Sequence, residues 1–321
     1  MNNARREIPV VFASDEGYLK YCSVAIKSLM RSRAADTIYH IYILCECIAD
    51  SVRQKLSSVS LPNVTVEFIE VGKNLDESLL FVDGHVTKET YYRILIPEVL
   101  AQWEKVIYLD VDLICNRDIA ELMEINLDNR LLAGVITVGN ENRKDYALNY
   151  LGIPYETYIN AGVLVIHNRE IHKRFGGGEK FVEACCAYLR EKRRLEWHDQ
   201  DLLNVLCYPD IVYLDHRWNT TPSRIMREKN KRLEEIDRSD INESYIFHYA
   251  TNKPWKNRLL ALYVPFWENA YRSVFFDEII KEYDSISDPK LHFISLCGEG
   301  RISLLFILKC FCRAIISRIK R

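Results

Sequence analysis

The sequence predicts an α/β fold in which a mostly parallel mixed sheet is flanked by helices. Segments with strand character alternate along the chain with segments whose apolar residues recur at helical spacing. Such alternation is typical of a largely parallel sheet that is covered on both faces. The chain has 321 residues, 48% of them hydrophobic and 27% charged, so it carries enough apolar material for a large core.

The first half of the chain shows the alternation most clearly. Short apolar or alternating runs predict strands at the start of 8–18 and at 38–46 and 63–71. Helical spacing predicts helices at 18–33 and 49–59. Ligands in such folds lie beyond the carboxyl ends of the strands, so small and acidic residues at those ends are candidates for a site.

The next segment combines a helix with a fourth strand. Residues 88–100 have a helical pattern that Pro97 is expected to disturb. Residues 105–113, "KVIYLDVDL", form an apolar run that predicts a strand ending in acidic residues. The remaining predicted elements are strands at 131–138, 159–168 and 245–251, helices within 176–194 and at 199–207, and a polar connector at 232–244.

Asp110 and Asp112 end the fourth predicted strand, with Val111 between them. In an extended chain their side chains point to the same face, with Cα atoms about 6.6 Å apart. Two like charges there repel, so one must bind a proton or both must share a cation, and an amide substitution should relieve the repulsion. Oxygen ligands suit Mg²⁺ or Mn²⁺, although aspartate also simply stops strands.

Six segments occur in the order found in one known family and cover roughly residues 8–260. They are "VVFASDEGY", "TYYRILIPEVL", "KVIYLDVDLI", "YINAGVLVIH", "HDQDLLN" and "FHYATNKPW". The chain resembles the retaining glycosyltransferases of family 8, which have the nucleotide-sugar fold called GT-A. The resemblance is strongest to bacterial lipopolysaccharide or lipooligosaccharide galactosyl- and glucosyltransferases, with glycogenin more distant. It implies transfer of a hexose, galactose or glucose, from a UDP-sugar to a saccharide acceptor in cell-surface glycan synthesis.

The resemblance implies a Mn²⁺ or Mg²⁺ ion held by Asp110, Asp112 and His248. On residue type alone, a single histidine in a strand is more often a core or surface residue. Alternation places the His248 side chain on the strand face away from the neighbouring aromatic residues. Two carboxylates and an imidazole leave coordination positions for diphosphate oxygens, where the cation neutralises the departing UDP.

Residues after the first strand match the part of the family site that holds uracil and ribose. Ala13 and Ser14 are small, so a base can approach the backbone there. Asp15 can accept hydrogen bonds from ribose hydroxyls or the uracil N–H. Tyr18 can stack on the base, although packing on the following helix is an alternative role for it.

Residues in later segments are implied at the diphosphate and the donor sugar. Arg93 matches an arginine that bridges sugar and phosphate, and Lys253 matches a lysine that contacts the diphosphate. A surface arginine and a solvated loop lysine are the alternatives. Thr251 stands where the family has glycine, and the loop to Lys253 is one residue shorter. The other implied residues are Val111, between the two aspartates, and Asn160 and Ala161, for which an ordinary turn at the start of a strand is the alternative.

"HDQD" carries the residues implied at the reacting centre. The resemblance places Asp199 on the sugar hydroxyls and Gln200 near the anomeric carbon, as the catalytic pair. Asp199 as a helix cap is the alternative. Retention of configuration normally indicates a carboxylate nucleophile. Because an amide is a poor nucleophile, we favour front-face return, in which the departing phosphate deprotonates the acceptor hydroxyl.

The last residues differ in composition from the rest of the chain. Net charge is −2, but six basic and no acidic residues lie in 301–321, so residues 1–300 carry −8. Residues 301–321 have the pattern of a basic amphipathic helix that lies on anionic lipid, with a docked C-terminal helix as the alternative. We expect a catalytic domain over 1–275 and a helical, membrane-associating extension over 276–321.

The location and partners follow from the same observations. The N-terminus has no signal-peptide pattern, and no run of about 18 apolar residues spans a bilayer. We expect a cytoplasmic enzyme, peripheral on the inner face of the cytoplasmic membrane, with a lipid-linked acceptor and no nucleic-acid partner. Two other functions remain open: a haloacid dehalogenase-type phosphohydrolase, which also uses Asp-x-Asp, and a non-catalytic nucleotide-sugar binder. Against the phosphohydrolase, Asp-x-Asp follows the fourth strand rather than the first.

Overall fold

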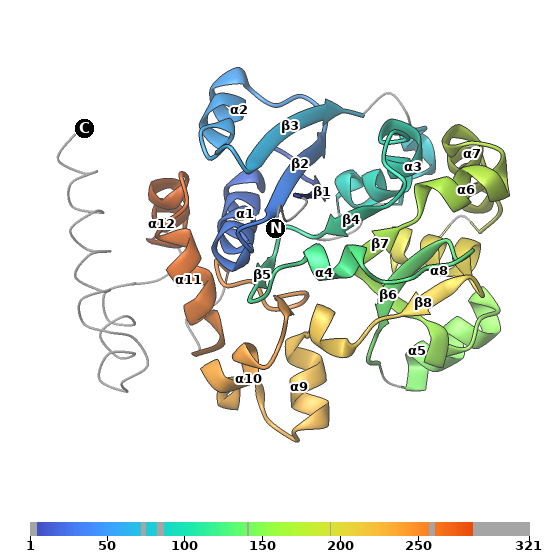
Figure 1. Cartoon of the computed structure of the whole chain (residues 1–321). Helices are drawn as coiled ribbons and strands as arrows, with labels where there is room; N and C mark the ends of the chain where they lie inside the picture. Colours follow the sequence, from blue (N-terminus) through green and yellow to red (C-terminus); the bar gives the residue numbers. More distant parts are fainter. Residues whose placement is uncertain are drawn as a thin grey trace.

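The computed structural model of the chain describes residues 5–71, 75–81, 87–139, 141–192, 194–256 and 261–284 (Figure 1). Strands and helices alternate within them. The strands are β1 (Arg6–Ala13), β2 (Thr37–Cys45), β3 (Val64–Glu70), β4 (Val106–Leu109), β5 (Leu113–Cys115), β6 (Leu132–Ile136), β7 (Ile159–Ile166), β8 (Ile211–Tyr213) and β9 (Ile246–His248). The α-helices are α1 (Leu19–Ser32), α2 (Asp50–Ser57), α3 (Ile96–Val99), α4 (Ala120–Met123), α5 (Glu141–Asp145), α6 (Asn168–Phe175), α7 (Gly178–Lys192), α8 (His198–Cys207), α9 (Pro222–Glu228), α10 (Arg238–Asn242), α11 (Val264–Ala270) and α12 (Phe276–Asp284).

The larger sheet has the strand order β3-β2-β1-β4-β7-β6-β8. The strands from β3 to β4 are parallel to one another, whereas β7 is antiparallel to both β4 and β6. At the far edge, β8, which the sequence does not predict, is parallel to β6. The predicted mixed, mostly parallel sheet is confirmed. Because β7 runs against β4, its first residues lie beside the carboxyl end of β4, where Asp110 N donates to Gly162 O (2.9 Å).

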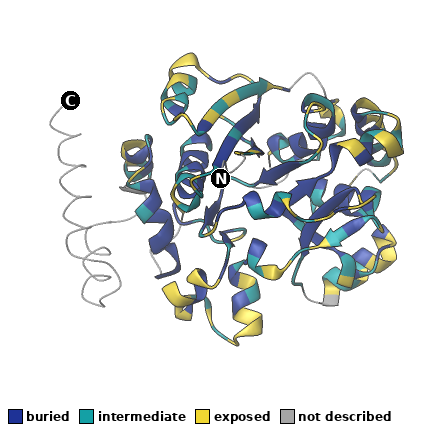
Figure 2. Ribbon diagram, in the orientation of Figure 1, coloured by how far each residue is buried: buried dark blue, intermediate teal, exposed yellow. Residues whose placement is uncertain are grey.

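Two buried clusters hold the helices against the two faces of this sheet. On β1, Val10 and Phe12 belong to a cluster that includes residues of α1 and α11. Val11, which points the other way, belongs to a cluster that includes residues of α3, α7 and α8. Figure 2 shows buried residues along the central strands and on the inner sides of these helices. The sheet is therefore covered on both faces, as predicted.

The segment 105–113 is not one continuous strand, and this prediction was wrong. β4 ends at Leu109, β5 begins at Leu113, and residues 110–112 form a bend between them. The bend carries the chain from the seven-stranded sheet to a separate two-stranded sheet. The two aspartates are therefore not brought together by strand alternation, because their backbone is not extended.

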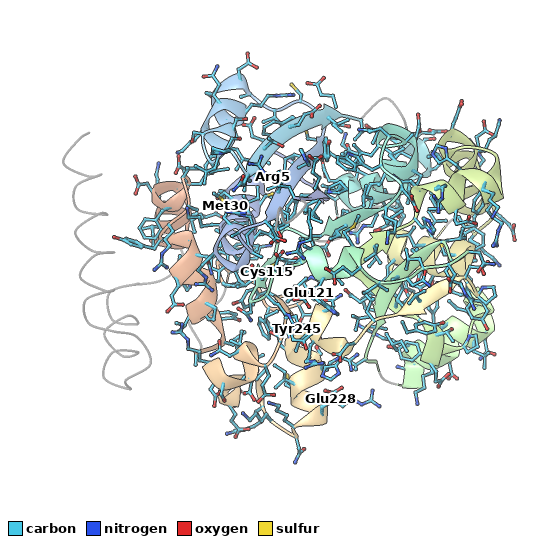
Figure 3. All side chains as sticks on the ribbon, in the orientation of Figure 1. Arg5, Met30, Cys115, Glu121, Glu228 and Tyr245 are labelled. Carbon is cyan, nitrogen blue, oxygen red and sulfur yellow. The ribbon has the colours of Figure 1, made fainter. Side chains whose placement is uncertain are left out.

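The small sheet pairs β5 with β9 in antiparallel orientation, and Leu113 lies opposite His248. Cys115, at the end of β5, and Tyr245, just before β9, mark the other end of this pairing (Figure 3). Asn116 N donates to Tyr245 O (2.8 Å) and extends the contact by one residue. This pairing places a residue from late in the chain next to the bend that follows β4.

Residues 88–99 are helical, and Pro97 does not break the helix. Residues Lys88–Leu95 form a 3₁₀-helix, and α3 follows with Pro97 in its first turn. Proline is favoured there because the first N–H groups of a helix have no partner within the helix. The predicted connector at 232–244 contains α10, whose start Asp237 caps by accepting from Ser239 N (2.8 Å).

The C-terminal extension predicted from residue 276 begins with α12. Phe276 and Ile279 are buried in the same cluster as α1, and Glu282 accepts a hydrogen bond from Tyr21 OH (2.9 Å). The predicted membrane-binding segment, 301–321, lies outside the described residues. Within the part of the chain that is described, no helix has both the length and the apolar character to cross a bilayer.

Candidate active site

A cavity of about 320 Å³ opens at the carboxyl ends of β1 and β4, beside the start of β7. Pockets for small ligands and cofactors typically enclose roughly 300–1,000 Å³. All residues that the resemblance implies at the UDP-sugar line this cavity, although they come from six separate segments. They are Ala13, Ser14, Asp15, Tyr18, Arg93, Asp110, Val111, Asp112, Asn160, Ala161, Asp199, Gln200, His248, Thr251 and Lys253.

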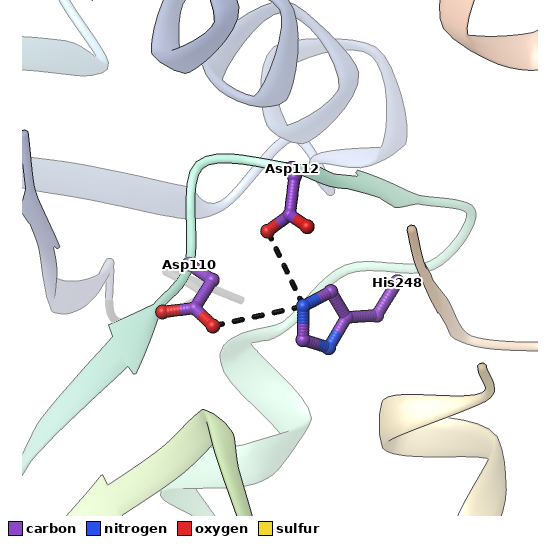
Figure 4. A group of neighbouring side chains, drawn as sticks. All are labelled: Asp110, Asp112 and His248. Carbon is purple, nitrogen blue, oxygen red and sulfur yellow. Dashed lines mark ion pairs between the residues drawn. The ribbon is translucent and has the colours of Figure 1, made fainter. Parts of the chain in front are cut away.

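Asp110, Asp112 and His248 converge on one point of the cavity (Figure 4). His248 Nε2 lies 3.6 Å from Asp110 Oδ2 and 3.2 Å from Asp112 Oδ1. The three candidate ligand atoms all lie within 4.8 Å of one another. Asp112 and His248 are buried, and Asp110 is partly exposed. Two carboxylates and one imidazole nitrogen facing a common point fit a divalent cation such as Mn²⁺ or Mg²⁺.

Gly162 leaves the space in which these side chains meet. A Cβ atom added at this position would lie 2.3 Å from His248 Cε1 and 2.8 Å from Asp110 Oδ2. Both distances are far below van der Waals contact, so any side chain at position 162 would displace the imidazole or the carboxylate. The small residues of "INAGVLVI" therefore serve the site as well as the strand.

Asp112 also has a cationic partner in Lys253, whose Nζ donates to Asp112 Oδ2 and to Ala250 O (3.2 Å). Burial raises the pKa of Asp112, but the charges of Lys253 and His248 lower it more, and its pKa lies below the usual value. The carboxylate is thus held ionised by its partners. The sequence predicts that an amide at position 112 relieves the repulsion between the two aspartates. In the structure it would also remove the favourable ionic contact with Lys253, so that prediction is incomplete.

Arg93 is 4% exposed, so the alternative of a surface arginine is wrong. Its Nη2 lies 3.2 Å from Asp110 Oδ1, and its Nε lies 2.7 Å from Asp199 Oδ2. Its Nη1 donates to Ala161 O. A buried guanidinium needs such partners because an unpaired buried charge is costly. Arg93 thereby joins the bend after β4, the start of β7 and the start of α8.

Asp199 lies in the first turn of α8, which begins at His198, and it does not cap the helix. The pKa of Asp199 is raised to about 7, because burial and the charge of Asp110 raise it by more than the charge of Arg93 lowers it. Its Oδ2 receives no directed hydrogen bond, because Arg93 Nε donates to Thr90 O (2.9 Å). Hydrogen bonds from the Asp199 backbone and from Thr90 also lower the pKa of the carboxyl group, but the effect of burial is larger.

Asp15 and Tyr18 shape the loop between β1 and α1. Asp15 Oδ1 accepts from Tyr18 N (2.7 Å) and closes the turn before the helix. The Tyr18 ring packs edge-on against Tyr21, with centroids 5.5 Å apart, and against Trp255, at 6.1 Å. The alternative of packing on the following helix is therefore correct as a contact, although Tyr18 also lines the cavity.

The sequence did not reveal four further residues near the site. Arg143 and Trp197 line the cavity, with the Arg143 Cζ 3.8 Å from the centroid of the indole ring. Asn219 contacts His248, and Tyr158 contacts Gln200. Trp197 and Tyr158 closely precede "HDQD" and "INAG", a signal that could have found them. Arg143 and Asn219 stand in segments without a recognisable pattern.

The family model described as "Glycosyl transferase family 8" matches residues 9–258. The chain therefore belongs to glycosyltransferase family 8, and it is a glycosyltransferase. This membership removes the support for the phosphohydrolase alternative. The match covers the sheet, the bend at 110–112 and the segment that ends in Lys253.

Several individual proteins are similar to this chain. The chain is 23% identical over 300 residues to "General stress protein A" of Bacillus subtilis strain 168, covering 88% of this chain and 97% of that protein. It is 23% identical over 258 residues to "Lipopolysaccharide glucosyltransferase WaaO" of Escherichia coli strain K12, covering 77% of this chain and 72% of that protein. The crystal structure of galactosyltransferase LgtC with donor and acceptor sugar analogs superposes on this structure with a TM-score of 0.66. The two sequences are 22% identical, and the match covers 88% of this chain and 97% of that chain. This likeness shows that the fold is GT-A.

Proposed function

We propose that the protein is a metal-dependent, retaining hexosyltransferase that moves galactose or glucose from a UDP-sugar to a saccharide acceptor. The observation that carries the proposal is the convergence of Asp110, Asp112 and His248 in a cavity at the carboxyl ends of the strands. Breaking the sugar–phosphate bond builds negative charge on UDP, and a bound Mn²⁺ or Mg²⁺ supplies the Lewis acid that neutralises it. The three side chains would hold that ion.

In this proposal the uridine lies against the loop that follows β1. Ala13 and Ser14 present little more than backbone to the cavity, which suits the close approach of a base. Asp15 is placed to accept from ribose or uracil, and Tyr18 offers an aromatic face. The support is that all four line the same cavity as the metal-binding candidates.

The diphosphate and the donor sugar occupy the rest of the donor site. Lys253, Thr251 and the backbone at Val111 would contact the diphosphate, and Lys253 would exchange part of its contact with Asp112 for phosphate oxygens. Arg93 Nε and Asp199 Oδ2 lie 2.7 Å apart at the buried wall of the cavity, which suits the recognition of sugar hydroxyls. Asn160 and Ala161 would contact the sugar from the start of β7, and this assignment completes the donor residues.

The environment of Gln200 supports front-face return. Its Oε1 accepts hydrogen bonds from Asn160 Nδ2 (3.1 Å) and Ala161 N (3.1 Å). An amide oxygen has two lone pairs, and both are engaged, which disfavours attack on the anomeric carbon. In the proposed step the sugar–phosphate bond breaks, the acceptor oxygen bonds the anomeric carbon on the same face, and its proton passes to the departing phosphate. A covalent glycosyl adduct on Asp199 or Gln200 of the unaltered enzyme, detected by mass spectrometry, would contradict this route.

The acceptor is proposed to be a saccharide, lipid-linked, in lipopolysaccharide or related glycan synthesis. The names of relatives such as the lipopolysaccharide glucosyltransferase of Escherichia coli support this class. Trp197 with Arg143 across its ring offers an aromatic wall of the kind on which sugar rings pack. We further propose a cytoplasmic location, with a catalytic domain over 1–275 and an extension over 276–321 that binds the inner face of the membrane.

A panel of nucleotide sugars tests the function. With Mn²⁺ present, release of free UDP is expected from UDP-galactose or UDP-glucose, and not from GDP- or CMP-sugars. Addition of EDTA should abolish it. Hydrolysis of small phosphomonoesters would favour a phosphohydrolase instead, and metal-independent binding without turnover would favour a non-catalytic binder.

The membrane proposal has a separate test. A variant that ends at residue 300 should lose binding to vesicles containing anionic phosphatidylglycerol and should keep UDP-sugar hydrolysis, because the six basic residues of 301–321 are removed. Neutral phosphatidylcholine vesicles serve as the control. Unchanged binding of the shortened protein to anionic vesicles would contradict the proposal.

A further inference from the structure

A chain of hydrogen bonds leads from the candidate metal ligand His248 to Gln200. His248 Nδ1 lies 2.9 Å from Asn219 Oδ1, and Asn219 Nδ2 donates to Asn160 Oδ1 (2.7 Å). Asn160 Nδ2 donates in turn to Gln200 Oε1 (3.1 Å), and Gln200 Nε2 to Tyr158 OH (3.1 Å). The chain thus connects groups on β9, η6 (His216–Asn219), β7 and α8.

Two backbone N–H groups of β7 fix the direction of this chain. Gly162 N donates to Asn160 Oδ1 (3.0 Å), and Ala161 N donates to Gln200 Oε1 (3.1 Å). A backbone N–H cannot become an acceptor, so neither amide can be flipped without placing two donors face to face. Beyond Gln200, Tyr158 OH donates to the carboxylate of Asp201, which agrees with the same direction.

The fixed direction determines the tautomer of His248. Since Asn160 presents Oδ1, Asn219 must present its Nδ2 to Asn160 and its Oδ1 to His248. The Nδ1 of His248 therefore carries a hydrogen, and the Nε2 that faces Asp110 and Asp112 is the ring nitrogen that a cation would bind. Asn219 is 2% exposed, so water does not compete for these bonds.

We propose that Asn219 is a positioning residue that holds His248 in the metal-binding tautomer and, through Asn160, aligns the Gln200 carboxamide. This inference rests on the proposed metal-dependent transfer and adds a physical link between the cation and the reacting end of the donor sugar. Histidine ligands generally need a hydrogen-bond partner on the second ring nitrogen, and loss of that partner typically weakens metal binding by about 10–100-fold.

Two substitutions separate the two bonds that Asn219 makes. Asn219→Ala removes both, whereas Asn219→Asp keeps an acceptor for His248 Nδ1 and loses the donor to Asn160. Mn²⁺ affinity is measured on the full-length protein from the electron paramagnetic resonance signal of free Mn²⁺, and turnover from UDP release. Asn168→Ala is the matched control, because Asn168 is a buried asparagine outside the cavity that donates to Leu100 O (2.9 Å).

We expect Asn219→Ala to weaken Mn²⁺ binding at least about tenfold, and Asn219→Asp to retain Mn²⁺ binding while kcat falls. Asn168→Ala should lower thermal stability and leave Mn²⁺ affinity unchanged. If Asn219→Ala does not fold, the retained affinity and lowered kcat of Asn219→Asp decide alone. The inference is overturned if the wild type binds Mn²⁺ and the Asn219 variants match it in both affinity and kcat. A wild type that does not bind Mn²⁺ would overturn the proposed metal function itself.

Discussion

His248 Nε2 lies 3.2 Å from Asp112 Oδ1, although the histidine ends β9 and the aspartate stands in the bend after β4. The two residues meet because β5, which follows the bend, pairs with β9. The imidazole, bonded at Nδ1 to Asn219, turns its Nε2 toward two carboxylates, an arrangement that a cation stabilises. The pairing of these two short strands therefore assembles the candidate metal site.

Mn²⁺ should raise the thermal stability of the protein through this site. A ligand that binds only the folded state adds about 2.7 kcal/mol at a concentration 100 times its dissociation constant. We expect the midpoint of thermal unfolding to rise with Mn²⁺ concentration in the wild type and not in His248→Ala. Differential scanning fluorimetry in EDTA and in graded Mn²⁺ measures both. An equal rise in the two proteins would show that Mn²⁺ binds elsewhere.

Asp112→Asn should abolish Mn²⁺-dependent UDP release and also lower stability. The pKa of Asp112 lies below its usual value, so the ionised group stabilises the fold above the pKa of the unfolded chain, and this contribution is present at neutral pH. Removing its charge replaces the ionic contact with Lys253, which also donates to Ala250 O (3.2 Å), by a weaker one, at a cost of roughly 1–3 kcal/mol. Urea unfolding at pH 7 in EDTA measures the loss. If Asp112→Asn were more stable than the wild type, repulsion between Asp110 and Asp112 would outweigh the contact with Lys253, and this prediction would be contradicted.

Gly162→Ala should displace His248 and Asp110 while leaving both side chains chemically unchanged. The new Cβ would lie 2.3 Å from His248 Cε1, so the imidazole must move and Mn²⁺ affinity should fall at least tenfold, within the roughly 10–100-fold range for misoriented ligands. Gly134→Ala is the control on the neighbouring strand β6, where the new Cβ would lie 2.6 Å from Ile159 Cδ1, in the core. Both variants should lose stability. Equal Mn²⁺ affinities in the two would contradict the account.

Asp199→Asn should change how stability depends on pH. The pKa of Asp199 in the folded protein is about 7, above its ordinary 3.8, so the folded state favours the protonated form. The raised pKa therefore adds to the free energy of unfolding below pH 3.8, and this contribution is lost as the pH rises to about 7. The total loss is roughly 4 kcal/mol. Asparagine stays neutral and lacks this dependence. The stability of Asp199→Asn relative to the wild type should therefore rise between pH 4 and 7 and stay level above.

Urea unfolding in EDTA across that pH range measures the difference. Asp145→Asn, at an exposed aspartate of α5, is the control. A constant difference between Asp199→Asn and the wild type from pH 4 to 8 would show that the Asp199 carboxyl titrates as it does in water.

The sequence predicted the sheet, and the residues that the resemblance implies all line one cavity, in part for a physical reason. The carboxyl ends of parallel strands lie at the same edge of a sheet. Residues such as Asp15 and Asp110, which follow apolar strands, therefore lie near each other even when the loop conformations are unknown. The antiparallel strand β7 was harder to foresee, because a buried strand has the same apolar pattern in either direction. Its direction nevertheless decides that Asn160 lies at the site.

The sequence failed where the outcome depends on contacts between distant segments. The bend at 110–112 breaks an apolar run that reads as one strand, because Leu113 pairs with β9 instead of continuing in the larger sheet. Asn219 has no pattern around it, and its importance follows only from its two partners. The burial of Arg93 is likewise set by Asp110 and Asp199, which come from other elements.

Anomalous X-ray diffraction from a crystal soaked in Mn²⁺ and UDP, recorded above and below the manganese absorption edge, tests the central claim most directly. The account predicts one strong manganese peak within bonding distance of Asp110, Asp112 and His248 Nε2, with UDP oxygens completing the coordination. UDP bound in the cavity with no manganese among these three side chains, or manganese bound elsewhere, would contradict it.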